Sequence, residues 1–82
     1  MEKEKILTNI DKIHTTDGGI KRIKNNLKLK EDCDIISYCK DKITQNNSRI
    51  YKEGKNWYCI VDNIKLTINS YSYTIITAHT IK

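Results

Sequence analysis

The sequence predicts an α+β fold in which helices occupy the first half of the chain and a four-stranded antiparallel sheet the second. Apolar residues recur with helical spacing up to about residue 46 and alternate with polar residues after residue 48. The chain has no proline and no low-complexity linker, and its 82 residues suffice for one modest core. We therefore expect a single domain over residues 1–82, with a helical part at 1–46 and a sheet part at 48–82.

Two to three helices are expected in the first part. The first has an apolar stripe of helical spacing, formed by Ile6, Leu7, Ile10 and Ile13. A break follows at H-T-T-D-G-G, because hydroxyl groups, an acid and glycines favour helix ends. The buried stripe of the second helix is Ile20, Ile23 and Leu27. A third helix begins near K-E-D-C-D, ends at T-Q-N-N-S, and buries Ile35, Ile36, Cys39 and Ile43.

The sheet part is predicted to be a meander of four antiparallel strands. R-I-Y-K-E is the first strand, and W-Y-C-I-V-D and I-K-L-T-I-N are joined at Asp62-Asn63, a pair suited to the positive φ angles of a type I′ hairpin. That hairpin predicts an apolar face of Trp57, Cys59, Val61, Ile64, Leu66 and Ile68. The opposite face carries Tyr58, Ile60, Lys65, Thr67 and Asn69. The last strand is Y-T-I-I-T-A-H-T-I-K, and the helices pack on one side of the sheet.

Two registers are open for the last strand, since a shift of one residue moves every side chain to the other face. One register places Tyr73, Ile75, Thr77 and His79 on the core side. The other buries Thr74, Ile76 and Ala78 and leaves Tyr73, Thr77 and His79 on the open face. We favour the second register because it spares His79 a burial without a partner.

Composition excludes several classes of protein. The three cysteines form no C-x-x-C and no zinc pattern, so we expect buried free thiols and neither a metal nor a cofactor. The N-terminus is charged rather than that of a signal peptide, and no apolar run approaches the roughly 20 residues of a membrane span. A cytoplasmic protein without membrane contact is expected.

The net charge of +5 is compatible with a nucleic-acid partner. Nearly all of the 15 basic residues are lysines, whereas arginine is the better bidentate ligand for phosphate. The charge is therefore weak support for such a partner.

Three motifs carry a resemblance to a known family. These are the H-T-T that begins at His14, the G-K-N-W at Gly54–Trp57 and the S-Y-T-I-I-T-A-H at Ser72–His79. At these motifs, and over nearly its whole length, the chain resembles a small bacterial family catalogued as a domain of unknown function. The family name implies no activity.

A weaker resemblance concerns the order of elements. Helices followed by a four-stranded antiparallel sheet, with a polar last strand ending in Ile76, Thr77, Ala78 and His79, resemble the barnase/EndoU/colicin/RelE-like nucleases. This resemblance implies a small, metal-independent ribonuclease of the toxin type that cuts RNA on the open face of its sheet.

Metal-free RNA cleavage needs a general base and a general acid, and histidine suits both roles because its ordinary pKa is about 6.5. The chain has two histidines, and we expect them at the site if the fold brings them together. The candidate catalytic residues are His14, His79, Thr77 and Tyr73. The candidate substrate-binding residues are Lys65, Thr67, Asn69, Tyr58, Arg22 and Lys24.

Each of these residues also has an ordinary structural explanation. His14 suits the C-terminus of the first helix, His79 the solvated end of a strand, and the basic stretch K-R-I-K-N-N-L-K-L-K a solvated helix face. Two further functions stay open. One is a non-catalytic module of a mobile element or phage that binds RNA or another nucleic acid, a nucleotide or a protein on the open sheet face. The other is a protein that forms a homodimer through the sheet face or edge.

Overall fold

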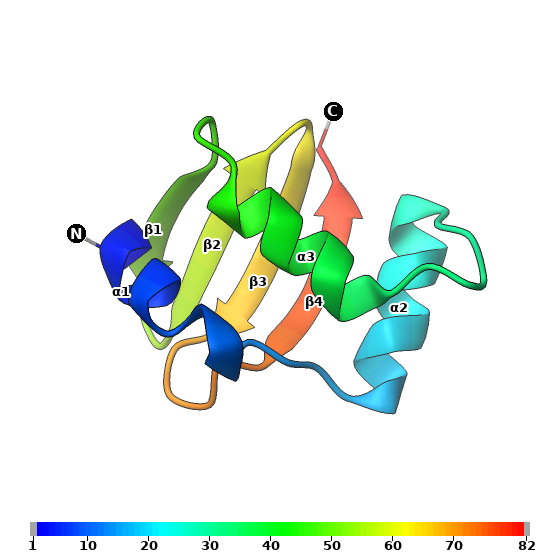
Figure 1. Cartoon of the computed structure of the whole chain (residues 1–82), viewed down its shortest axis with the longest axis horizontal. Coiled ribbons are helices and arrows are strands. Elements are labelled where there is room, and N and C mark those ends of the chain that lie inside the picture. The colour runs from blue at the N-terminus through cyan, green and yellow to red at the C-terminus, as the bar shows by residue number, and fades with distance from the viewer. Residues whose placement is uncertain (1, 82) are drawn as a thin grey trace.

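In the computed structural model, which describes residues 2–81, helices precede a four-stranded antiparallel sheet of order β1-β2-β3-β4, as predicted (Figure 1). The helices are α1 (Glu2–Thr8), the short 3-10 helix η1 (Ile10–Lys12), α2 (Asp17–Leu27) and α3 (Ile35–Thr44). The strands are β1 (Arg49–Glu53), β2 (Asn56–Val61), β3 (Ile64–Asn69) and β4 (Ile75–Thr80). Thr16 and Asp34 cap α2 and α3 by accepting hydrogen bonds from backbone N–H groups.

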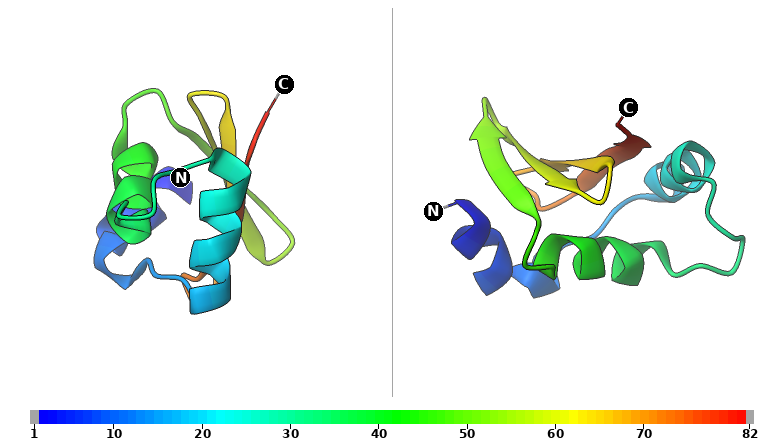
Figure 2. Two further views of the ribbon diagram at one scale, coloured as in Figure 1. Left: turned by 90° about the vertical axis from the view of Figure 1, so that its right-hand side faces the viewer. Right: turned by 90° about the horizontal axis from the view of Figure 1, so that it is seen from above.

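The helices lie on one side of the sheet. α3 crosses in front of the strands, α1 lies beside β1, and α2 runs along β4 (Figures 1 and 2). No helix of residues 2–81 covers the opposite face. Within the same residues, none of the helices combines the length and apolar character needed to cross a membrane.

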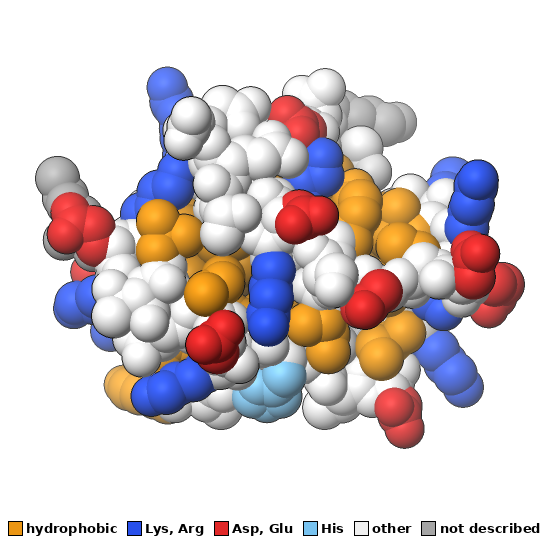
Figure 3. Space-filling view, viewed as in Figure 1, with side chains coloured by type: hydrophobic (Ala, Val, Ile, Leu, Met, Phe, Trp, Pro, Cys, Tyr) orange, Lys and Arg blue, Asp and Glu red, His pale blue; other side chains and the backbone are white. Residues whose placement is uncertain are grey.

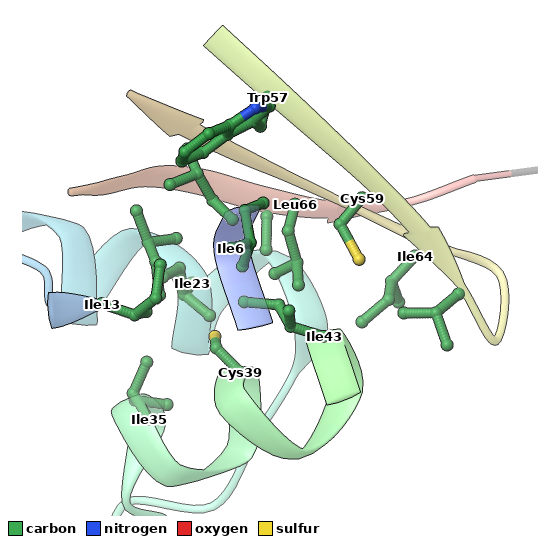
Figure 4. Close-up of a cluster of buried hydrophobic side chains, with 14 residues drawn as sticks. Ile6, Ile13, Ile23, Ile35, Cys39, Ile43, Trp57, Cys59, Ile64 and Leu66 are labelled. Atoms are coloured by element: carbon green, nitrogen blue, oxygen red, sulfur yellow. The ribbon is translucent and has the colours of Figure 1, made fainter. Parts of the chain in front are cut away.

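The core lies between the two layers (Figure 4). All six side chains predicted to face inward from β2 and β3 are buried. They meet the apolar side chains of Ile13, which follows η1, and of five helical residues, namely Ile6, Ile23, Ile35, Cys39 and Ile43. Asp62 and Asn63 have φ angles of 50° and 64°, which confirms the predicted hairpin. Burial of 14 apolar residues holds the helices on this face of the sheet.

The first helix is shorter than predicted. It ends at Thr8, and Leu7 is 37% exposed rather than buried. Asn9 donates its side-chain N–H to the carbonyl of Lys5, and after η1 the chain becomes extended at Ile13. His14 then forms an isolated parallel bridge with Thr74. The apolar residues have helical spacing up to Ile13, but the pairing of His14 with Thr74 holds this part of the chain extended. His14 therefore does not end a helix.

The last strand follows neither of the two uniform registers. Thr67 pairs with Thr77 while Ile68 pairs with Ile75, so a bulge inserts Ile76 as an extra residue. Because of the bulge, Ile75 and Ala78 are both buried and Ile76 is 36% exposed.

The favoured register was therefore right after the bulge, and wrong at Ile76 and before it. Ala78 lies inside, and Thr77 and His79 lie on the open face, as predicted. Thr74 is only half-buried, and Tyr73 packs against the core cluster instead of lying on the open face.

Candidate nucleic-acid interface

The uncovered side of the sheet presents a mixed polar and aromatic surface. Side chains alternate between faces along a strand, so the residues between the buried positions point away from the helices. We define the open sheet face by Arg49, Tyr51, Glu53, Tyr58, Ile60, Lys65, Thr67, Thr77 and His79. Asn69 lies at its end, on the last position of β3.

A row of two aromatic rings and a lysine crosses three strands of this face. Tyr51 pairs with Tyr58 across β1 and β2, and their rings stack with centroids 5.3 Å apart and planes at 27°. Nζ of Lys65 lies 4.7 Å from the centroid of the Tyr58 ring, within the range of a cation–π contact. Tyr51 is 42% exposed. We call Tyr51, Tyr58 and Lys65 the aromatic row.

Hydrogen-bonding groups lie next to the aromatic row on β3 and β4. Thr67 is opposite Thr77, and Lys65 is opposite His79. Asn26 of α2 reaches around the edge of the sheet and donates to the hydroxyl of Thr77 at 3.4 Å. The fold thus brings Tyr58, Lys65, Thr67, Thr77 and His79, all predicted candidates, onto one surface.

The structure does not bring His14 to that surface. Its Nδ1 lies 2.8 Å from the carbonyl oxygen of Lys12, and its Nε2 lies 3.1 Å from Oγ1 of Thr74. A carbonyl only accepts, so Nδ1 carries a hydrogen and Nε2 faces the hydroxyl of Thr74. Thr74 precedes His79 by five residues, which is about 16 Å along an extended strand. The two histidines are therefore far apart.

Tyr73 and Asn69 build the turn between β3 and β4. Tyr73 has a φ of 60°, and its ring packs on Trp57 with centroids 5.3 Å apart. The side-chain oxygen of Asn69 accepts hydrogen bonds from the backbone N–H groups of Tyr71 and Ser72. These contacts stabilise the turn, and they engage both side chains there.

Arg22 and Lys24 lie on α2, where they have intramolecular partners. Arg22 donates to the carbonyl of Ile76 at 2.8 Å, and Lys24 donates to the carbonyl of Glu31 at 2.7 Å. Neither side chain belongs to the open sheet face.

The helical side offers no surface of a single charge. Figure 3 shows acidic and basic side chains interspersed over it, with apolar patches between them. A hollow of about 540 Å³ beside α2 has the same mixed character. It is lined by Asp17, Ile20, Lys21, Lys24, Asn25 and Glu31. Acidic and basic side chains thus lie side by side around this hollow.

The cysteines are free thiols in the described structure, as predicted, and two of them are buried. Burial raises the pKa of Cys39 to about 12 and that of Cys59 to about 11. Cys33 is only half-buried. Two thiols are thus held in the protonated form at neutral pH and act as core side chains.

Sequence reasoning missed Tyr51 and Arg49. The position of Tyr51 on the open sheet face could have been predicted from the sequence, because a two-residue loop at Gly54-Lys55 places Tyr51 directly opposite Tyr58. The predicted second strand began at Trp57, which left a three-residue loop and another register, whereas Asn56 already belongs to β2.

Comparison with known proteins confirms the first of the two resemblances. The sequence model of a family described as "Protein of unknown function (DUF3781)" matches residues 7–79. No curated protein and no solved structure matches the chain. The resemblance to nucleases finds no support in these comparisons.

Proposed function

The chain belongs to the DUF3781 family of proteins of unknown function, and we propose that it binds single-stranded RNA on the open sheet face. The aromatic row is the observation that carries this proposal. It combines two stacked rings with a cation on a face that no helix of residues 2–81 covers.

The chemistry of the face fits a single strand better than a duplex. Unpaired bases stack on aromatic side chains, and each such contact contributes about 1–3 kcal/mol to binding. Lys65 supplies a positive charge for a phosphate next to a stacked base. The hydroxyls of Thr67 and Thr77 and the ring of His79 supply hydrogen-bonding groups for base edges or for the ribose 2′-hydroxyl.

Binding is favoured over cleavage because the histidines are separated. A metal-free ribonuclease needs a general acid and a general base at one phosphate. His79 is on the open sheet face beside Lys65, whereas His14 is bound to Thr74 outside it.

The proposal is tested by fluorescence anisotropy with labelled single-stranded RNA, single-stranded DNA and duplex RNA. Tyr51→Ala should weaken RNA binding by about 5- to 150-fold, the equivalent of one stacking contact, because Tyr51 is the exposed ring of the aromatic row whereas Tyr58 already lies between Tyr51 and Lys65. Lys65→Gln should lower the slope of log K against log salt by about one unit. Tyr71→Ala is the matched control, since Tyr71 is 77% exposed in the turn between β3 and β4.

Equal affinity of wild type and Tyr51→Ala, or no binding at micromolar protein, would contradict the proposal. The same RNA is incubated in EDTA to detect cleavage. Products that end in a 2′,3′-cyclic phosphate and disappear with His79→Ala would show a ribonuclease instead of a binding module.

A further inference from the structure

We propose that β1 pairs antiparallel with β1 of a second copy of this chain, centred on Tyr51, so that two four-stranded sheets become one continuous sheet. This interface goes beyond RNA binding and does not depend on it.

The two edges of the sheet differ in how they are covered. Side chains from α2 and the residues before it donate to the outward carbonyls of β4: Thr15 to Ile75, Arg22 to Ile76 and Asn26 to Ala78. Among residues 2–81, no hydrogen bond joins the backbone of β1 to any element other than β2. Although α1 lies beside β1, none of its described residues bonds to the backbone of that strand, so β1 is the edge whose hydrogen-bonding groups can accept another strand.

The hairpin between β1 and β2 decides which groups of β1 point outward. Glu53 and Asn56 close a two-residue loop, and the closing pair of such a hairpin exchanges both hydrogen bonds. Since bonded pairs alternate along an antiparallel ladder, Arg49, Tyr51 and Glu53 use their backbone groups toward β2. The N–H and C=O groups of Ile50 and Lys52 point to the free edge.

In an antiparallel pair of β1 strands, three registers allow Ile50 and Lys52 to exchange hydrogen bonds with the β1 strand of a second copy. Pairing Lys52 with Lys52 sets like charges opposite each other, which is unfavourable. Pairing Ile50 with Ile50 leaves Lys52 and Glu53 beyond the opposing strand. Pairing Ile50 with Lys52 aligns all five residues of both strands.

The third register is also complementary in charge. In this register Arg49 of each copy lies opposite Glu53 of the other, which gives two such pairs. Tyr51 lies opposite Tyr51 of the second copy, at the two-fold axis that relates the copies. Arg49 and Glu53 are both exposed, and neither forms an ion pair within the described residues. Tyr51 would occupy a non-hydrogen-bonded pair, where opposing side chains are closest. The strand is thus self-complementary in hydrogen bonds, charge and aromatic contact.

The test is sedimentation equilibrium without RNA, over concentrations up to the millimolar range. Wild type should dimerise, and Arg49→Glu or Glu53→Arg alone should weaken the dimer by roughly tenfold or more, because two attractive pairs become repulsive. The double variant Arg49→Glu/Glu53→Arg restores opposite charges and should restore the dimer. Lys30→Glu, on the loop after α2, makes the same change of net charge as Arg49→Glu and should leave the dimer intact.

A monomer at every concentration would overturn the inference, as would a dimer that survives both single reversals. Amide hydrogen exchange gives an independent measurement on the wild type. The amides of Ile50 and Lys52 should become protected as protein concentration rises, and unchanged exchange in a dimer would show that another surface forms it.

Discussion

His14 and Thr74, sixty residues apart, join the segment before α2 to the start of β4. Nε2 of His14 lies 3.1 Å from Oγ1 of Thr74, and the backbone N–H of Ile75 donates to the carbonyl of His14 at 2.7 Å. The ring is also held at Nδ1 by the carbonyl of Lys12. These bonds fix the path of the chain between η1 and α2, so the H-T-T motif has a structural explanation.

His14→Ala should therefore lower stability without affecting RNA binding. Loss of the side-chain hydrogen bonds should reduce the free energy of unfolding by about 1 kcal/mol. Urea denaturation measures this change, and anisotropy with single-stranded RNA measures the affinity. An unchanged stability together with a lost affinity would assign His14 to the binding site instead.

Gly18 and Gly19, which follow the H-T-T motif in α2, should respond oppositely to alanine. A Cβ on Gly19 would lie 2.1 Å from Oγ1 of Thr15, whose hydroxyl donates to the carbonyl of Ile75. Gly19→Ala should therefore push α2 from β4 and cost about 1–3 kcal/mol of stability. A Cβ on Gly18 meets nothing closer than 3.9 Å, so Gly18→Ala should stabilise α2 by up to about 1 kcal/mol.

Thermal unfolding of the two variants, side by side, checks this contrast. If Gly19→Ala unfolds at the wild-type temperature or above, the close packing of α2 on β4 is not the reason for glycine at this position.

Stability should fall in acid because several carboxylates, Asp62 and Asp34 among them, have favourable partners in the folded state. A hydrogen bond from Lys42, at 2.8 Å, lowers the pKa of Asp62, and the backbone N–H of Ser37 lowers the pKa of Asp34. Above the unfolded-state pKa of about 3.9 both contributions are fully present. As the pH falls further, the unfolded chain binds protons first and the contributions are lost.

We expect the urea midpoint to decrease as the pH falls below about 4, and to decrease less in Asp62→Asn, which cannot titrate at this position. Identical pH profiles for wild type and Asp62→Asn would show that the contact with Lys42 does not contribute.

The cysteines should differ in reactivity. Burial raises the pKa of Cys39 and Cys59, so few thiolates form there at pH 8, whereas Cys33 is half-buried. With Ellman's reagent, one thiol should react in the folded protein and the other two only after unfolding. Three thiols that react together without denaturant would contradict the packing of the core.

Features that depend on neighbouring residues could be predicted from the sequence. The hairpin at Asp62-Asn63 and the alternation of Trp57 with Tyr58 are local, because turn geometry and the two-residue period of a strand determine them. The register of β2 against β3 follows from these two facts alone.

Features that depend on distant contacts could not be predicted in this way. The bulge at Ile76 occurs in a strand whose outer edge contacts α2, and the early end of α1 accompanies the pairing of His14 with Thr74. Arg22 and Lys24 were grouped with the sheet residues because periodicity does not tell on which side of the sheet a helix docks.

The most direct test of the central claim is a nuclear magnetic resonance titration of isotope-labelled protein with single-stranded RNA. The account predicts that shifts in the amide and side-chain signals concentrate on the open sheet face, led by Tyr51, Tyr58, Lys65, Thr67 and Thr77, while α3 stays unchanged. Shifts confined to the helices, or none at millimolar RNA, would contradict it.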